Sequence, residues 1–328
     1  MDKREPITAS NLGPVVSVLT WILEAAVVIA VGIKFTLSSI IPGKRNREDV
    51  ALFLATAFSI GFTISISFAV PNGIGKHQET LSFHQLESLQ RAVYSADILL
   101  ILVSSCVQMS VLIFLHEVTP NRVHRSIINA MAGFIALFFL ASFFAAVFPC
   151  QPPHVWRLLG VECIDQLSFW EAFAAVNIVI ESSLVLFPVI IVYPLRMKRR
   201  HKAILVSCFA ARLIVIVTFA VQIYEAQTLK LQLYDVTFYA WKYLLAIVFV
   251  QGLSIITVCI PYIRNLLLGM ESGMIQTGHV RLPSRHSVEA EFRLRAIPTG
   301  KMNSNLSSSR DAQLEEPATS HGTNGERS

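Results

Sequence analysis

The sequence predicts an all-α polytopic membrane protein, a bundle of seven transmembrane helices. Of its 328 residues, 53% are hydrophobic and only 15% are charged, and the mean hydropathy is +0.56. Soluble domains carry about 25% charged residues. The hydrophobic residues gather in runs of about 20, the length that crosses a bilayer as a helix, which excludes a soluble globular fold. The net charge of +5 falls in connections and tail, so it bears on topology and gives no indication of nucleic-acid binding.

The first three spans are delimited by polar residues and helix breakers. Span one covers residues 15–34 and leads to a basic connection, and span two covers residues 50–70. Span two ends at the sequence Pro71-Asn72-Gly73-Ile74-Gly75, which breaks a helix. Span three covers residues 92–115 and carries an amphipathic stripe, which predicts a face turned into the bundle. The stripe consists of Tyr94, Asp97, Ile101, Ser104 and Gln108.

The remaining four spans alternate with polar connections in the same way. They cover residues 127–148, 170–194, 203–224 and 238–263. Span four is rich in phenylalanine and alanine, and the strongest basic cluster of the chain, Arg196 to Lys202, separates span five from span six. The chain is therefore divided into a short N-terminus, a membrane domain and a polar tail with the composition of a disordered segment. The limits of these parts are residues 1–14, 15–264 and 265–328.

The distribution of lysine and arginine predicts the orientation. These residues gather in the connections after spans one, three and five and are few in the connections after spans two, four and six. Because basic connections stay on the cytosolic side, we expect an N-terminus that is outside or luminal and a C-terminus in the cytosol, in the plasma membrane or an endomembrane. The loop between Cys150 and Cys163 then faces an oxidising compartment, where a disulfide persists. We expect this bridge, and two free thiols are the alternative.

Five polar side chains within the spans are candidates for chemistry. They are Glu24, Asp97, Asn177, Glu181 and Arg212. Asn177 and Glu181 are four residues apart and share one helix face. A charge in mid-membrane costs roughly 3 kcal/mol or more, so we expect Glu181 to pair with Arg212, while Glu24 and Asp97 have no evident partner. A lone acid can donate a proton or can hydrogen-bond neighbouring helices together, and both interpretations stay open.

Several motifs occur in the order and spacing of a known family. They are Glu48-Asp49, Gly73-Ile74-Gly75-Lys76-His77, Ser110, Phe148-Pro149-Cys150 with Pro152, Trp156 and Cys163, Asn177 with Glu181, Pro188, Arg212, Asp235 with Thr237, and Ile260-Pro261. Over residues 15–264 the chain resembles the fungal seven-span rhodopsin-domain membrane proteins, the group that includes the satratoxin-cluster membrane protein. It departs from that family at three membrane positions, with Gln108 in place of lysine, Glu181 in place of aspartate and Gln251 in place of glutamate.

The resemblance implies an association with fungal secondary metabolism. One hypothesis is an intramembrane cyclase or isomerase that acts on a lipophilic, prenylated or polyketide intermediate. A protonated acid would start the reaction, and the phenylalanine rings together with Trp170 would shield cationic intermediates. The alternative is a seven-span receptor or sensor, which the basic connection after span five also suits. A transporter is disfavoured because no inverted repeat is evident.

Cofactors and metals are not expected. A retinal Schiff base needs a lysine deep in a span, whereas Lys242 and Lys34 are predicted near span ends. His77 and His84 lack the spacing of a regular metal-ligand set and are interpreted as surface residues. The expected partners are the lipid bilayer, a lipophilic small molecule and a cytosolic protein that binds the C-terminal tail.

Overall fold

A computed structural model describes residues 12–40, 47–119, 121–150, 165–192, 210–232 and 235–271. All regular structure in these stretches is helical, and seven of the helices are long and apolar enough to cross a membrane. The predicted fold class and the multi-pass arrangement are thereby confirmed. Cys163, the basic cluster Arg196 to Lys202 and residues 272–328 of the C-terminal tail lie outside the described residues, whereas residues 265–271, which were assigned to the tail, are helical.

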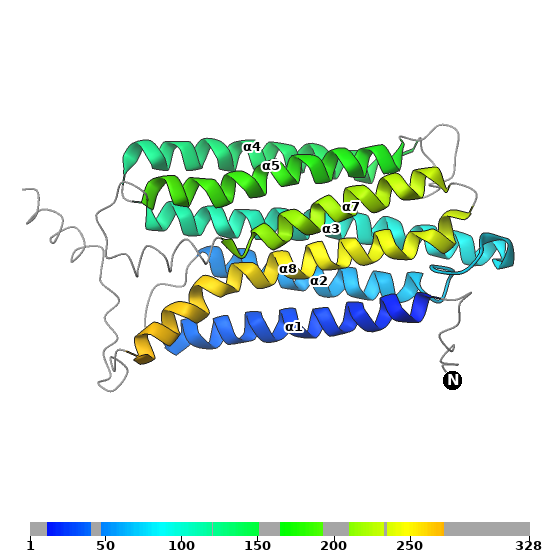
Figure 1. Ribbon diagram of the computed structural model, residues 1–328, viewed down its shortest axis with the longest axis horizontal. Coiled ribbons are helices and arrows are strands. Elements are labelled where there is room, and N and C mark those ends of the chain that lie inside the picture. The colour runs from blue at the N-terminus through cyan, green and yellow to red at the C-terminus, as the bar shows by residue number, and fades with distance from the viewer. Residues whose placement is uncertain are drawn as a thin grey trace, which may run out of the picture. The chain divides into compact units, whose positions relative to one another are not determined.

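Consecutive long helices run in opposite directions, so the described connections alternate between two ends of the bundle (Figure 1). The helices are α1 (Gly13–Ile40), α2 (Arg47–Ala69), the short 3-10 helix η1 (Gln78–Thr80), α3 (Phe83–Val118), α4 (Arg122–Val147), α5 (Gln166–Val192), α7 (Leu213–Leu231) and α8 (Val236–Glu271). Ser82 and Gln85 form a capping box at the start of α3, which satisfies backbone N–H groups that have no partner within the helix.

Six of the predicted spans lie inside these helices or overrun them by one or two residues. The sixth span differs, because α7 begins at Leu213 and continues past the predicted end to Leu231. Charged residues near the end of α7 suggested a connection, but Lys230 remains helical and donates to Glu171 of α5 at 2.8 Å. Arg212 is therefore the N-cap residue of α7 and does not lie in the middle of a helix, while residues 203–209 are outside the described part.

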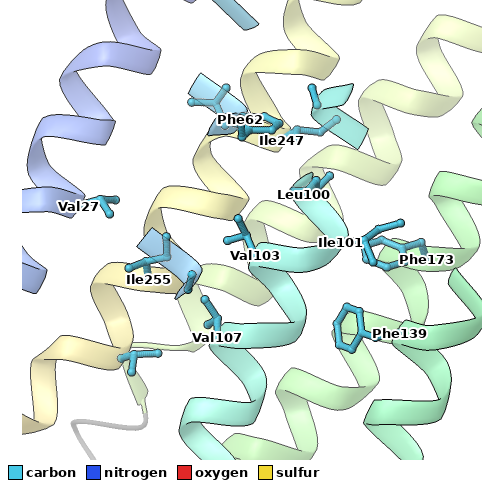
Figure 2. Close-up of a cluster of buried hydrophobic side chains, with 14 of the residues drawn as sticks. Val27, Phe62, Leu100, Ile101, Val103, Val107, Phe139, Phe173, Ile247 and Ile255 are labelled. Carbon is cyan, nitrogen blue, oxygen red and sulfur yellow. The ribbon is translucent and has the colours of Figure 1, made fainter. Parts of the chain in front are cut away.

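Helix α3 lies at the centre of the bundle and packs against α2, α4, α5 and α8. Figure 2 shows Ile101 of α3 beside Phe173 of α5, whereas Val103 lies on the side of α3 that is turned toward Ile255 of α8. Large apolar side chains on the outside of the bundle are exposed, for example Phe53, which is 62% exposed. This arrangement, with an apolar core and an apolar exterior, suits a helix bundle surrounded by lipid.

The connection between α2 and α3 is tied to the beginnings of α1 and α8. The Gly75 N–H donates to the Thr237 carbonyl at 2.9 Å, and the Leu12 N–H donates to the Gly75 carbonyl at 3.3 Å. Gly75 has a φ of +78°, and a Cβ atom there would lie 2.7 Å from the Gly13 nitrogen. Glycine is therefore required at this position both by the backbone conformation and by the close approach of α1.

The cysteines fall into two groups. Cys106 and Cys259 are free thiols on α3 and α8, within the apolar part of the bundle. Cys150 is buried after the end of α4, but its predicted partner Cys163 lies outside the described residues. The Cys150–Cys163 disulfide therefore stays a prediction, and so does the orientation of the two ends across the membrane.

Helices α1 and α8 approach each other closely at Gly252. A Cβ atom there would lie 2.4 Å from Leu23 Cδ2 and 2.5 Å from Leu23 Cγ. Gly252→Ala is therefore expected to lower the midpoint of thermal unfolding, since overpacking of a core costs about 1–3 kcal/mol. The matched control is Gly32→Ala, because a Cβ atom at Gly32 meets nothing within 4 Å. Equal unfolding midpoints for the two purified variants would contradict the close approach.

Candidate functional site

The buried polar side chains within the spans form three separate groups. The Arg212 network consists of Gln108, Asn177, Glu181 and Arg212. The Glu24 group consists of Glu24, Ser59, Thr63 and Gln251. The Asp97 group consists of Asp97, Trp170, Gln222 and Tyr243. The predicted site residues are therefore distributed over three places.

The Arg212 network joins α3, α5 and the start of α7. Arg212 Nη1 donates to Glu181 Oε2, and Gln108 Nε2 donates to Asn177 Oδ1 at 2.9 Å and to Glu181 Oε1 at 3.3 Å. Asn177 Nδ2 donates to the Phe173 carbonyl at 2.8 Å. Each of the four network side chains is at most 2% exposed. The structure thus brings together three predicted site residues, Asn177, Glu181 and Arg212, and pairs the carboxylate with the guanidinium.

This network is better suited to holding helices than to proton transfer. The Glu181 carboxylate is neutralised by Arg212, and moving its proton would break a buried ion pair. Gln108 adds donors without adding charge, so the network carries one positive and one negative group. Gln108 was not predicted as a site residue, although its place on the amphipathic stripe of α3 was a usable signal.

The Glu24 group joins α1, α2 and α8. Ser59 Oγ donates to Glu24 Oε2 at 2.6 Å, and Thr63 Oγ1 donates to the same oxygen at 3.2 Å. Gln251 Nε2 donates in turn to Ser59 Oγ at 2.9 Å. No charged partner for Glu24 was evident in the sequence, and the structure shows neutral ones, because α2 turns two hydroxyls, four residues apart, toward the carboxylate.

The Asp97 group joins α3, α5, α7 and α8. The Trp170 side chain lies within hydrogen-bonding reach of Asp97, a neutral partner that was not evident from the sequence. Tyr243 lies close to Gln222 and near enough to Asp97 for an electrostatic interaction. The Tyr243 hydroxyl and the Gln222 amide nitrogen are buried and make no hydrogen bond of normal geometry within the described residues.

Two members of the Asp97 group were missed at the sequence level. Gln222 is an amide in an apolar stretch of α7 and is only 2% exposed, so its polarity was a usable signal. Tyr243 offered no comparable signal, because tyrosine is common near the ends of membrane spans. Within the described residues, no lysine, arginine or histidine forms an ion pair with Asp97.

An aromatic cluster adjoins the Asp97 group through Trp170. It consists of Phe138 and Phe139 of α4 and Phe169, Trp170 and Phe173 of α5. The ring centroids of Trp170 and Phe173 are 5.2 Å apart in an edge-to-face arrangement, and those of Phe138 and Phe173 are 5.6 Å apart and stacked. Aromatic faces attract cations, so this cluster could stabilise positive charge next to the Asp97 carboxyl.

The Asp97 group lies at a different depth from the other two groups. Asp97 and Gln108 are eleven residues apart on α3, which corresponds to about 16 Å along the axis. Tyr243 and Gln251 are eight residues apart on α8, or about 12 Å. The Asp97 group and the Arg212 network nevertheless share α3, α5 and α7. A displacement of these helices at one group would therefore change the side-chain contacts at the other.

At one end of the bundle, the connection between α2 and α3 meets the start of α8. The His77 ring pairs with the Asp235 carboxylate and stacks on Phe238 at a centroid distance of 4.2 Å. Burial alone would raise the pKa of Asp235, but the Gln78 N–H and the His77 ring outweigh it and hold the pKa below its ordinary value. Within the described parts of the chain, no cluster of three or more His, Cys, Asp or Glu residues could hold a metal ion.

The lowered pKa of Asp235 has a consequence for stability. Its carboxylate stabilises the fold above the pKa of the unfolded chain, about 3.9, and this contribution is lost as the pH falls through the lower pKa of the folded state. Asp235→Asn is therefore expected to lower the midpoint of thermal unfolding near neutral pH, and the difference from the unchanged protein should shrink in acid. A difference that is constant across the pH series would contradict this assignment.

Comparison with protein families assigns the chain to a class. The fold defines a seven-helix membrane protein, and the fungal rhodopsin domain matches residues 27–269. Because this match covers most of the chain, the protein belongs to the fungal rhodopsin domain family, as its motifs predicted. The matched region contains the Asp97 group and the Arg212 network, whereas Glu24 precedes it. Searches of curated proteins and of solved structures find no match.

Proposed function

We propose that this membrane protein is an intramembrane cyclase or isomerase that acts on a lipophilic, prenylated or polyketide intermediate of fungal secondary metabolism. The observation that carries the proposal is the setting of Asp97. Its carboxyl group lies near Trp170 and Tyr243, beside the aromatic cluster and without an ion-pair partner among the described residues. An acid beside aromatic faces is the arrangement that protonation of a carbon–carbon double bond or an epoxide requires.

The reaction would need only the side chains of the Asp97 group and of the aromatic cluster. The Asp97 carboxyl group gives its proton to a double bond or epoxide of the substrate, and a second double bond closes the ring with its π electrons. The positive charge then lies next to Trp170 and its neighbouring rings. Loss of a proton from an adjacent carbon to the Asp97 carboxylate completes the cycle. The product is an isomer of the substrate, so no oxidant or reductant is consumed.

Tyr243 and Gln222 would position the substrate. Their hydroxyl and amide nitrogen are buried and make no hydrogen bond of normal geometry within the described residues. A buried polar group without a partner costs about 1–3 kcal/mol, which an oxygen of the substrate would offset by accepting from both. The preferred substrate is therefore an apolar chain that carries an oxygen function close to its reactive double bond.

A receptor or sensor without retinal is the second candidate function. It is favoured by the continuity of helices between the Asp97 group and the Arg212 network, which share α3, α5 and α7. A ligand that displaced these helices at the Asp97 group would alter the Arg212 network, whose Gln108 lies about 16 Å from Asp97 along α3. In this function Asp97 would bind a ligand without converting it.

The test compares metabolites in a fungal deletion strain that carries the unchanged protein, Asp97→Asn or Glu87→Gln. Glu87 is the matched control, since it lies near the start of α3 in an exposed pair with Arg91, outside the Asp97 group. The asparagine variant keeps shape and hydrogen bonding but has no proton to give. We expect it to accumulate one lipophilic intermediate at normal protein level, and we expect the glutamine control to form product normally.

The outcomes separate the two functions. An accumulated intermediate with the same formula as the missing product supports the isomerase. Altered gene expression without an intermediate supports the sensor. Normal product from Asp97→Asn, in folded protein, contradicts the proposed role of Asp97 as proton donor.

A further inference from the structure

The Glu24 group offers a set of oxygen atoms that the reaction at Asp97 does not use. We propose that this group binds a single monovalent cation with the coordination chemistry of Na⁺, between α1, α2 and α8. The ligand oxygens would come from the Glu24 carboxylate, the hydroxyls of Ser59 and Thr63, and the side-chain carbonyl of Gln251. The site is independent of the proposed cyclase or isomerase activity.

Two oxygen atoms of the Glu24 group lack a hydrogen-bond partner among the described residues, which indicates that the group binds a ligand. Glu24 Oε1 and Gln251 Oε1 are buried and accept no hydrogen bond within the described residues. The Glu24 and Gln251 side chains are themselves only 6% and 4% exposed. Buried acceptors are normally satisfied, because each one left without a partner loses the hydrogen bonds it had in water. A cation coordinated by both oxygens would satisfy them.

The surroundings of the group are apolar. Val27 of α1 lies one turn from Glu24, and Phe62 of α2 lies between Ser59 and Thr63 in sequence. Figure 2 shows these two side chains together with Ile247 and Ile255 of α8, which lie one turn on either side of Gln251. A carboxylate in such a setting is costly without a countercharge.

Among the described side chains, no basic residue of α1, α2 or α8 lies near enough to Glu24 to supply that countercharge. Lys34 lies ten residues further along α1, about 15 Å away, and pairs with Asp49 at 3.0 Å. Lys242 lies nine residues before Gln251 on α8, about 14 Å away, and is exposed. The one basic residue of α2, Arg47, lies twelve residues before Ser59, about 18 Å away along the axis.

The charge of the group favours a monovalent ion. One carboxylate and one monovalent cation are neutral together, which suits a site within a span. Calcium takes six to eight oxygen ligands and more than one carboxylate in most sites, so it fits this group poorly. A proton is the other occupant that would neutralise Glu24, and the experiment separates it from a metal ion.

The bound ion would fasten α1 to α2 and α8. The test measures thermal unfolding of the purified full-length protein in sodium, potassium and choline chloride at constant ionic strength and pH. We expect sodium to raise the unfolding midpoint in a saturable way, and radioactive sodium to bind once per chain. Ser59→Ala should weaken the apparent affinity about tenfold or more, since even indirect partners of a metal ligand contribute that much.

A matched control is available on α8. Ser254 is buried, and its hydroxyl donates to the Val250 carbonyl at 2.6 Å, outside the Glu24 group. Ser254→Ala is therefore expected to keep the full sodium response. Glu24→Gln should abolish sodium binding, and if it does not fold, Ser59→Ala and Thr63→Val carry the test.

Three results would overturn the proposal. The first is an unfolding midpoint that depends on ionic strength but not on the identity of the cation. The second is sodium binding that Ser59→Ala and Thr63→Val leave unchanged. The third is a midpoint that rises as the pH falls and does not respond to sodium, which would identify a proton as the occupant of Glu24. None of these outcomes tests the role of Asp97, so the cation site and the reaction at Asp97 are tested independently.

Discussion

Replacing Arg212 with methionine is expected to destabilise the folded protein by about 3–5 kcal/mol. The guanidinium is 2% exposed and pairs with Glu181, which is equally buried. Methionine keeps much of the volume but removes the positive charge, so the carboxylate remains in the bundle without a countercharge. The expected result is a large loss of monodisperse protein in size-exclusion chromatography and a lower unfolding midpoint.

A second exchange distinguishes loss of the ion pair from loss of packing. Combining Arg212→Met with Glu181→Leu removes both charges, and replacing a buried ion pair by apolar residues of similar volume is often neutral. The double variant should therefore recover most of the stability. Arg91→Met is the matched control, because Arg91 is 60% exposed and its pair with Glu87 contributes less than about 1 kcal/mol. Equal damage in the single and double variants would show that packing dominates.

The second large effect is expected at Gly75. A Cβ atom at this position would lie 2.7 Å from the Gly13 nitrogen and 3.1 Å from the Leu12 carbonyl carbon, and backbone atoms cannot rotate away as a side chain can. The positive φ costs a further 1 kcal/mol or so for a residue with a Cβ atom. Gly75→Ala should displace the start of α1 and break the bond from the Gly75 N–H to the Thr237 carbonyl.

The level of folded protein in membranes measures this effect. We expect Gly75→Ala to accumulate far below the unchanged protein and to unfold at a lower temperature. Gly133→Ala is the control, since a Cβ atom at that glycine of α4 meets nothing within 4 Å. Normal accumulation and an unchanged midpoint for Gly75→Ala would contradict the tight contact between α1 and this connection.

The fold could be predicted because the apolar runs and the helix breakers are local features of the chain. The four-residue spacing of Asn177 and Glu181 likewise placed both on one face of α5 without knowledge of any neighbour. The pairing of Glu181 with Arg212 followed from the cost of a lone charge in lipid, as only one arginine was available within a predicted span. Each of these inferences uses only the residue content and spacing of single predicted spans.

The partners of Glu24 and Asp97 could not be predicted for a physical reason. They depend on which helices are neighbours and on how each helix is rotated about its axis. Ser59 meets Glu24 across 35 residues of sequence, and Trp170 meets Asp97 from another helix. The partner of Lys34 could not be predicted for the same reason. Lys34 was placed at a span end, but it is 1% exposed and pairs with Asp49 of the neighbouring helix α2.

The proposed reaction is tested most directly with purified protein and the intermediate that accumulates in the Asp97→Asn strain. Quenching of tryptophan fluorescence, to which Trp170 would contribute, reports binding, and mass spectrometry of the extracted lipid reports conversion. We predict that the unchanged protein binds the intermediate and converts it to an isomer of equal mass, whereas Asp97→Asn binds it and leaves it unchanged. Conversion by Asp97→Asn at the rate of the unchanged protein would contradict the proposal.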